Sequence, residues 1–167
     1  AVEVCEGQQL DIDFETQEQV SHDVYIEMIR LKTSVLLAAS MQIGAILGNA
    51  TIDDANLIYQ YAENLGLAFQ IQDDILDCFG EEALVGKQPG GDIIQNKKTI
   101  LLIEALKRCD QNNDVRLKEW IAKKSFSATE KVAQVKAIFE QYQLKEYGIS
   151  VRNSYVQQAM KALENIQ

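Results

Sequence analysis

The chain has 167 residues, of which 47% are hydrophobic and 25% are charged, which is enough for one domain with a buried core. Its formal net charge is −9 and its isoelectric point is near 4.6, which argues against a nucleic-acid partner because phosphate binding needs a basic surface. Cys5, Cys78 and Cys109 are odd in number and lack CxxC spacing, so we expect free thiols in a soluble, cytoplasmic protein.

The first predicted helix begins after Ser21, whose hydroxyl is suited to cap it, and runs to about Leu47. Apolar residues recur along it at intervals of three or four positions, which is typical of an amphipathic helix. Its most apolar stretch, Ser34–Asn49, is interrupted by Gln42 and is too short to span a bilayer. We therefore expect no transmembrane segment.

Helices are predicted for most of the remaining chain, which has only one proline and nine glycines to interrupt them. The predicted spans are about 52–79 with Thr51 as cap, 93–109, 115–124, 128–146 with a capping box of Ser127 and Glu130, and 151–166, with Gly148 as the stop before it. The only glycine-rich loop is Gly80–Asp92. No repeat or linker appears, so we predict a single all-α domain over residues 1–167, built as a bundle of long antiparallel helices.

The segment FQIQDDILD, residues Phe69–Asp77, places three aspartates on a helix that otherwise has a buried pattern. On a helical wheel Asp73 and Asp77 share one face, Gln70 flanks them, and the two isoleucines lie opposite. Carboxylates one turn apart repel each other, and no lysine or arginine lies between residues 32 and 87 to offset them. A solvated acidic face is one interpretation. A site for Mg²⁺, which prefers oxygen ligands, is the other.

Lysines follow the aspartates in the glycine-rich loop and just after it. Lys87 lies in GKQPGGD, and Lys97 and Lys98 lie in NKKT. Each lysine taken alone would be expected on the solvated surface. Together with the aspartates they indicate a metal ion and an anion at one place, and a diphosphate satisfies both requirements.

Four segments resemble, in the same order, motifs of the trans-isoprenyl diphosphate synthases, the farnesyl and geranylgeranyl diphosphate synthase family. They are EGQQLD (6–11), YIEMIRLKTSVLL (25–37), GLAFQIQDDILD (66–77) and GKQPGGDIIQNKKT (86–99). The remainder of the chain is similar to the family only as helices of suitable length. The resemblance implies the C-terminal half of the isoprenoid synthase fold.

The resemblance implies a prenyltransferase that condenses an allylic diphosphate with isopentenyl diphosphate, head to tail, into linear trans-isoprenyl diphosphates. The cofactor would be Mg²⁺, with Asp73 as the principal ligand and Asp74 and Asp77 as ligands or supports of the site. Because family members are usually dimers, we expect a homodimer whose interface includes the helix Tyr25–Leu47.

The resemblance also implies six substrate-binding residues: Lys32, Thr33, Phe69, Gln70, Lys87 and Lys97. The three lysines would bind the allylic diphosphate, although Lys98 adjoins Lys97 and either could reach the phosphate. Thr33 and Gln70 would line the place where the allylic carbocation forms, and with Lys32 they are the expected catalytic residues. Phe69 would lie near isopentenyl diphosphate. Catalysis by a Ser/His/Asp or Cys/His arrangement, or by zinc, has no support in this sequence.

The sequence departs from the family in one large respect. Family members are about twice this length, and their first DDxxD motif lies upstream of the segment that EGQQLD resembles. An isolated chain of this length is therefore expected to be inactive and to act only as part of a complete synthase. Three alternatives compete with this interpretation: a non-catalytic, diphosphate-binding or regulatory half-protein on the same fold; a related cyclase, which the GK–G–D–K pattern after DDxxD disfavours; and an unrelated acidic helical scaffold that mimics the motif.

Overall fold

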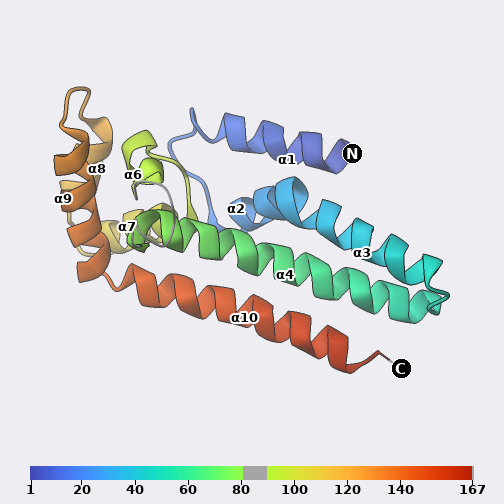
Figure 1. Ribbon diagram of the computed structural model, residues 1–167. Coiled ribbons are helices and arrows are strands. Elements are labelled where there is room, and N and C mark those ends of the chain that lie inside the picture. Colours follow the sequence, from blue (N-terminus) through green and yellow to red (C-terminus); the bar gives the residue numbers. More distant parts are fainter. Residues whose placement is uncertain (81–89, 167) are drawn as a thin grey trace. The chain divides into compact units, whose positions relative to one another are not determined.

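The computed structural model describes residues 1–80 and 90–166, and this part of the chain is helical without strands (Figure 1). The helices are α1 (Val2–Asp13), α2 (His22–Ile29), the π-helical turn η1 (Arg30–Ser34), α3 (Val35–Leu47), α4 (Ile52–Phe79), α6 (Gly91–Gln95), α7 (Ile100–Gln111), α8 (Arg116–Ala122), α9 (Ala128–Gln141) and α10 (Leu144–Glu164). The predicted all-α class is confirmed. Most of the predicted glycine-rich loop, including Lys87, lies outside the described residues.

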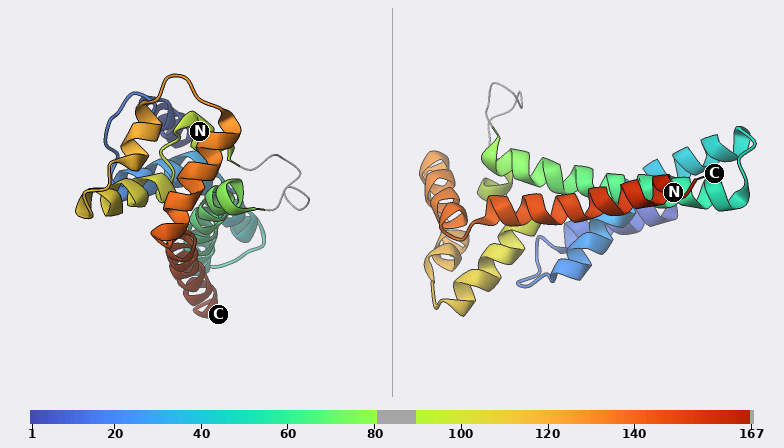
Figure 2. Two further views of the ribbon diagram at one scale, coloured as in Figure 1. Left: turned by 90° about the vertical axis from the view of Figure 1, so that its left-hand side faces the viewer. Right: turned by 90° about the horizontal axis from the view of Figure 1, so that it is seen from below.

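Backbone contacts divide the chain into two compact units. The first unit comprises Ala1–Asp13, Ile26–Ile71 and Ser150–Gln167, and the second comprises Phe14–Tyr25 and Gln72–Ile149. The long helices α4 and α10, which Figure 2 shows from two sides, each contribute residues to both units. The expectation of a single domain stays a prediction.

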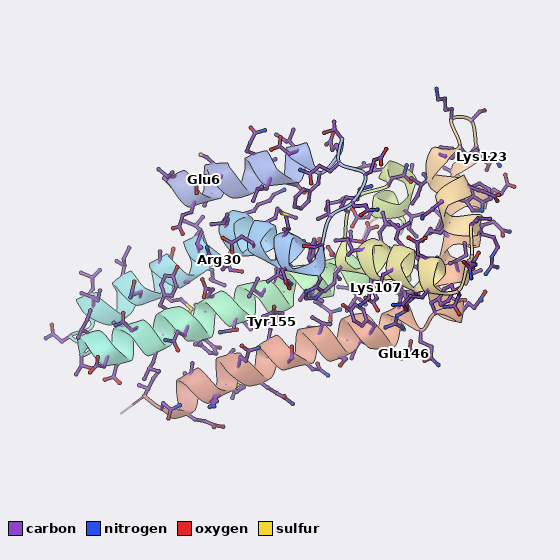
Figure 3. The ribbon with its side chains drawn as sticks, turned by 180° about the vertical axis from the view of Figure 1, so that it is seen from behind. Glu6, Arg30, Lys107, Lys123, Glu146 and Tyr155 are labelled. Carbon is purple, nitrogen blue, oxygen red and sulfur yellow. The ribbon has the colours of Figure 1, made fainter. Side chains whose placement is uncertain are left out.

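In the first unit, the helical run from η1 to α3 pairs with α4 in antiparallel fashion. Gln42 of α3 donates a hydrogen bond to Asn56 near the start of α4 at 2.9 Å. Arg30 of η1, which is labelled in Figure 3, pairs with Glu63 farther along α4 at 3.2 Å. Small side chains allow the two helices to approach closely. Three alanines in these helices are completely buried: Ala38, Ala55 and Ala62.

The predicted helix after Ser21 forms, with one local difference. The Ser21 hydroxyl accepts a hydrogen bond from the backbone N–H of Val24 at 3.3 Å, as expected of a cap. The helix then widens into η1, where Gly7 of α1 and Gly66 of α4 approach its backbone. A Cβ on Gly66 would lie 2.7 Å from the Ser34 hydroxyl. Hydrophobic periodicity carries no signal for a single π-helical turn or for these contacts.

By length and composition alone, the continuous helix His22–Leu47 could cross a membrane. It is the one such helix among the described residues, and the core helix of a soluble protein meets the same criterion. The expected absence of a transmembrane segment therefore stays a prediction.

The single helix predicted over residues 93–109 is wrong, because the structure has α6 and α7 separated by a short break. Asn96 ends α6 in the left-handed conformation, with φ of 54°. Thr99 then begins α7, and its hydroxyl accepts a hydrogen bond from the backbone N–H of Leu102 at 3.3 Å. Both residue types disfavour a helix interior locally, and here they end one helix and start the next.

The predicted end of the α9 region is also wrong. We expected a helix to Glu146 and a stop at Gly148, but α9 ends earlier and Gln143, with φ of 53°, separates it from α10. Gly148 lies inside α10, where a Cβ would approach side-chain carbons of Ile75 and Leu101 to 3.0–3.1 Å. This glycine therefore permits close helix packing and does not terminate a helix.

Candidate functional site

Two of the three aspartates on α4 are deeply buried in the second unit. Asp74 is 3% exposed and Asp77 is 4% exposed, whereas Asp73 is half-buried. The helical wheel correctly places the isoleucines in the core, since Ile71 and Ile75 are both buried. Buried carboxylates must be satisfied by hydrogen bonds or by cations, so the partners of Asp74 and Asp77 define the site.

Asp74 joins α4 to two other elements of the second unit. Its carboxylate accepts a short hydrogen bond from the Tyr25 hydroxyl of α2 and a second one, at 3.3 Å, from the backbone N–H of Ile100 at the start of α7. Burial raises the pKa of the Asp74 carboxyl to about 7, and the hydrogen bond from Tyr25 opposes this shift. Asp74 thus holds the start of α7 against α4.

Asp77 holds the start of α6 in the same unit. Its carboxylate accepts a hydrogen bond from the backbone N–H of Asp92 at 2.9 Å, and its main-chain carbonyl accepts one from Gly90 at 2.6 Å. Gly90 has φ of +98°, a conformation that glycine adopts readily. The glycines before Asp92 therefore allow this chain segment to lie directly against α4.

Asp92 connects the acidic segment to a predicted phosphate-binding lysine. The ammonium of Lys97 lies 3.5 Å from the Asp92 carboxylate. Burial raises the pKa of the Asp92 carboxyl, Lys97 opposes this, and the charges of Asp77 and Asp73 add to the increase. Lys97 also lines the same cavity as Asp74, one of the predicted aspartates, and its charge acts to lower the pKa of the Asp74 carboxyl. Asp92 itself was not predicted as a site residue, although the GGD of its motif was a usable signal.

A small cavity of about 20 Å³ lies beside these groups. Its polar lining comes from Asp74, Asp92, Asn96, Lys97 and Thr99, and the remainder is apolar. A cavity of this size with several polar groups can hold about one water molecule. The second unit therefore carries one buried carboxyl, one half-buried carboxyl and one ammonium around a space the size of a water molecule.

The aspartates can supply oxygen donors to a cation without forming a preassembled metal cage. Among the described residues, no three His, Cys, Asp or Glu side chains gather as a group able to hold a metal ion. Mg²⁺ in phosphate-binding sites is commonly held by one or two carboxylates, with water and substrate oxygens completing its shell. The Asp73 carboxylate fits that donor chemistry better than those of Asp74 and Asp77, because Asp73 is only half-buried and can be reached by a hydrated ion, whereas the other two are buried.

The first unit holds two further contacts that involve predicted site residues. The ammonium of Lys32, on η1, lies 2.6 Å from the carboxylate of Asp11, which belongs to the EGQQLD segment of α1. The Thr33 hydroxyl donates a hydrogen bond to the side-chain carbonyl of Gln70 at 3.2 Å. The sequence analysis selected Thr33, Gln70 and Lys32 but did not assign Asp11 as the partner of the lysine.

The other predicted residues fall outside these contacts. Phe69 lies on α4 with 66% of its surface exposed, so no packing within the described residues fixes its ring. Lys98 lines a different groove of the second unit, together with residues of α7 and α8. Lys87 lies outside the described residues.

A sequence model of the polyprenyl synthetase family matches residues 1–142 of this chain. The chain belongs to the polyprenyl synthetase family. The family resemblance expected from the four motifs is confirmed, and so is the isoprenoid synthase fold.

Individual relatives of the polyprenyl synthetase family agree with this assignment. The chain is 38% identical over 164 residues to a short chain isoprenyl diphosphate synthase of Methanothermobacter thermautotrophicus, covering 98% of this chain and 49% of the relative. It superimposes on a crystal structure of a geranylgeranyl pyrophosphate synthase with a TM-score of 0.92 and 43% identity, covering 99% of this chain and 52% of the other.

A further polyprenyl synthetase structure contains ligands. It is a geranylgeranyl pyrophosphate synthase from Corynebacterium glutamicum in complex with isoprenyl diphosphate and magnesium, with a TM-score of 0.87 and 26% identity. The alignment covers 99% of this chain and 47% of that one. The chain thus spans about half the length of the relatives that it matches.

Proposed function

We propose that this chain is part of a prenyltransferase that condenses an allylic diphosphate with isopentenyl diphosphate into a linear trans-isoprenyl diphosphate. The names of its relatives support this class of reaction. The observation that carries the proposal is the arrangement of Asp77, Asp92 and Lys97 beside Asp73 in the second unit. Carboxylates that can bind a divalent cation and an ammonium that can bind phosphate oxygens are the groups that a diphosphate requires.

The proposed cofactor is Mg²⁺, with Asp73 as its principal ligand in this chain. Asp74 and Asp77 are assigned as supports, because their oxygens accept hydrogen bonds from Tyr25 and Asp92. When bound, Mg²⁺ supplies positive charge that stabilises the departing diphosphate. The Corynebacterium relative, solved with magnesium, supports this choice of ion.

Lys97, Lys32 and Lys87 are proposed to bind the oxygens of the allylic diphosphate. An ammonium aimed at a leaving group stabilises the negative charge that develops as the carbon–oxygen bond breaks. Lys97 is held by Asp92 and Lys32 by Asp11, and these ion pairs limit the freedom of the two side chains before substrate arrives.

Thr33 and Gln70 are proposed to face the allylic carbocation with their side-chain oxygens. Their mutual hydrogen bond orients both groups, and neither is a strong nucleophile that would trap the cation. Phe69 is proposed to contact isopentenyl diphosphate, and its large exposed fraction leaves the ring accessible to a substrate.

We also propose that the complete protein is a cytoplasmic homodimer. The support comes from α3, where large apolar side chains are exposed in the first unit. Leu36, Ile43 and Leu47 are 60%, 57% and 81% exposed, respectively, and such a surface is costly in water unless it is covered. Light scattering at micromolar concentration should give a dimer for the full-length protein, and Ile43→Asp should shift it toward monomer.

The direct test of the proposed reaction uses the natural protein at full length with purified substrates. The protein is incubated with an allylic diphosphate, labelled isopentenyl diphosphate and Mg²⁺, and the products are separated by chain length. Label in a longer prenyl diphosphate supports the proposal. Absence of any elongated product, from protein that is folded and binds both substrates, would reject it in favour of a diphosphate-binding protein without turnover.

A further inference from the structure

Lys131 is a buried lysine that the proposed reaction does not use. It lies in the first turn of α9, in the second unit, and is only 1% exposed. No carboxylate in the described part of the chain pairs with its ammonium, and burial lowers its pKa below the ordinary value. A buried ammonium without a carboxylate is costly, so a structural or functional gain must offset that cost.

The ammonium of Lys131 binds the end of α6. It donates hydrogen bonds to the main-chain carbonyl of Ile94 at 3.0 Å and to the side-chain carbonyl of Asn96 at 2.7 Å. It also lies 4.4 Å from the centre of the Phe126 ring, which stabilises a cation. The side-chain amide of Asn96 in turn donates to the carbonyl of Ile121 on α8 at 3.2 Å.

The next residue of α9 contacts the other end of α6. A Cβ placed on Gly90 would lie 2.7 Å from a methyl group of Val132, so Val132 packs directly on the glycine that precedes this helix. Gly90 and Asn96 both have positive φ, at 98° and 54°. Two consecutive residues of α9, Lys131 and Val132, therefore hold both left-handed ends of α6.

The short helix α6 carries Asp92, and Lys97, which is assigned to the diphosphate, follows two residues after the helix ends. Asp92 binds Asp77 through its backbone N–H and Lys97 through its carboxylate, and the backbone N–H of Lys97 donates to the carbonyl of Asp92 at 2.9 Å. Because α6 has only five residues, its own hydrogen bonds cannot keep it in place. Its position depends on contacts from α4 on one side and α9 on the other.

We propose that Lys131 is a positioning residue, which holds the connection between α6 and α7 so that Asp92 and Lys97 are set for diphosphate binding. The inference rests on the proposed function, because that function assigns Lys97 to diphosphate. Asn96 transmits the restraint, since it is both the acceptor for Lys131 and the residue directly before Lys97. A hydrophobic side chain at position 131 would avoid the cost of burial but would leave two acceptors without their donor.

The experiment compares Lys131→Met, which removes the ammonium at similar length, with Lys131→Arg, which keeps a charged donor. The matched control is Ile138→Val, which trims an equally buried side chain farther along α9. All are made in the natural full-length protein. Binding of inorganic pyrophosphate with Mg²⁺ is measured by calorimetry, and amide hydrogen exchange is measured over residues 90–99.

We expect Lys131→Met to weaken pyrophosphate binding on the order of tenfold, as removal of residues that orient ligands commonly does. Exchange should become faster at residues 90–99, KM for the allylic diphosphate should rise more than kcat falls, and Lys131→Arg should lose less. Ile138→Val should change none of these. Pyrophosphate binding and exchange in Lys131→Met that match the wild type would overturn the inference, as would a wild-type protein that binds no pyrophosphate. If the wild type binds pyrophosphate but forms no longer product, the proposed reaction fails while the inference is still decided by the variants.

Discussion

Gly7 of α1 and Lys32 of η1 are in direct backbone contact in the first unit. A Cβ on Gly7 would lie 2.4 Å from the backbone nitrogen of Lys32 and 2.8 Å from its Cα. The same two elements are joined by the ion pair between Lys32 and Asp11. The EGQQLD segment therefore acts in the fold by placing the lysine that we assign to the allylic diphosphate.

Gly7→Ala should destabilise the protein and disturb Lys32. Because the obstructing atoms are backbone, they cannot move aside cheaply, and the free energy of unfolding should fall by about 1–3 kcal/mol or more. Gly44→Ala is the matched control, since a Cβ there meets nothing within 4 Å and should stabilise α3 by about 0.5–1 kcal/mol. Chemical denaturation of both variants checks the pair, and equal effects would contradict the assigned contact.

Asp73→Ala should lower turnover on the order of a hundredfold or more while the fold persists. The variant would lose the principal ligand of the Mg²⁺ ion whose positive charge stabilises the leaving diphosphate. Asp53→Ala removes an exposed aspartate from the first turn of the same helix and serves as control. Steady-state kinetics with circular dichroism as a check of folding make the comparison. Unchanged turnover in Asp73→Ala would remove this residue from the metal assignment.

Tyr25→Phe should destabilise the second unit by about 1–3 kcal/mol, because buried Asp74 would lose a hydrogen-bond donor. Tyr61→Phe removes a hydroxyl from α4 that makes no hydrogen bond within residues 1–80 and 90–166, so it should have little effect. The measurement is the free energy of unfolding in denaturant. Similar values for the two variants would show that the contact between Tyr25 and Asp74 contributes little.

Asp114→Asn should lower the thermal midpoint at pH 7, and the difference from wild type should narrow below about pH 4. The Arg116 guanidinium, 2.6 Å away, holds the pKa of the Asp114 carboxyl well below its ordinary value of 3.8. A carboxyl whose pKa is depressed in the folded protein contributes stability when the pH is above its pKa in the unfolded chain. This contribution is lost progressively as the pH falls from the unfolded-state pKa toward the folded-state pKa. Thermal unfolding at pH 7 and pH 3 tests the sign, and a difference of equal size at both would contradict it.

Three helix starts could be predicted from the sequence because their capping signals are local. The hydroxyls of Ser21, Thr51 and Ser127 each accept a hydrogen bond from a backbone N–H three residues later, as predicted. Helix ends were harder to predict. Asn96 and Gln143 end helices in left-handed conformations. The identity of these residues does not predict that conformation, because the packing around them determines where the helix ends.

The motifs in the sequence predicted which residues belong to the candidate site. The contacts among those residues could not be predicted from the sequence. The wheel grouped Asp73 with Asp77, but Asp77 is buried because α6 packs on it through Asp92. Asp74 is bound by Tyr25, 49 positions earlier in the chain. Local periodicity assigns a residue to a face of its helix, but it does not identify the distant segment that covers that face.

The central claim is tested most directly by incubating the natural full-length protein with an allylic diphosphate and labelled isopentenyl diphosphate, with and without Mg²⁺. The account predicts that label enters a longer prenyl diphosphate only when Mg²⁺ is present, and that Asp73→Ala nearly abolishes this incorporation. Incorporation that is unaffected by removal of the metal, or the complete lack of an elongated product from folded protein, would contradict it.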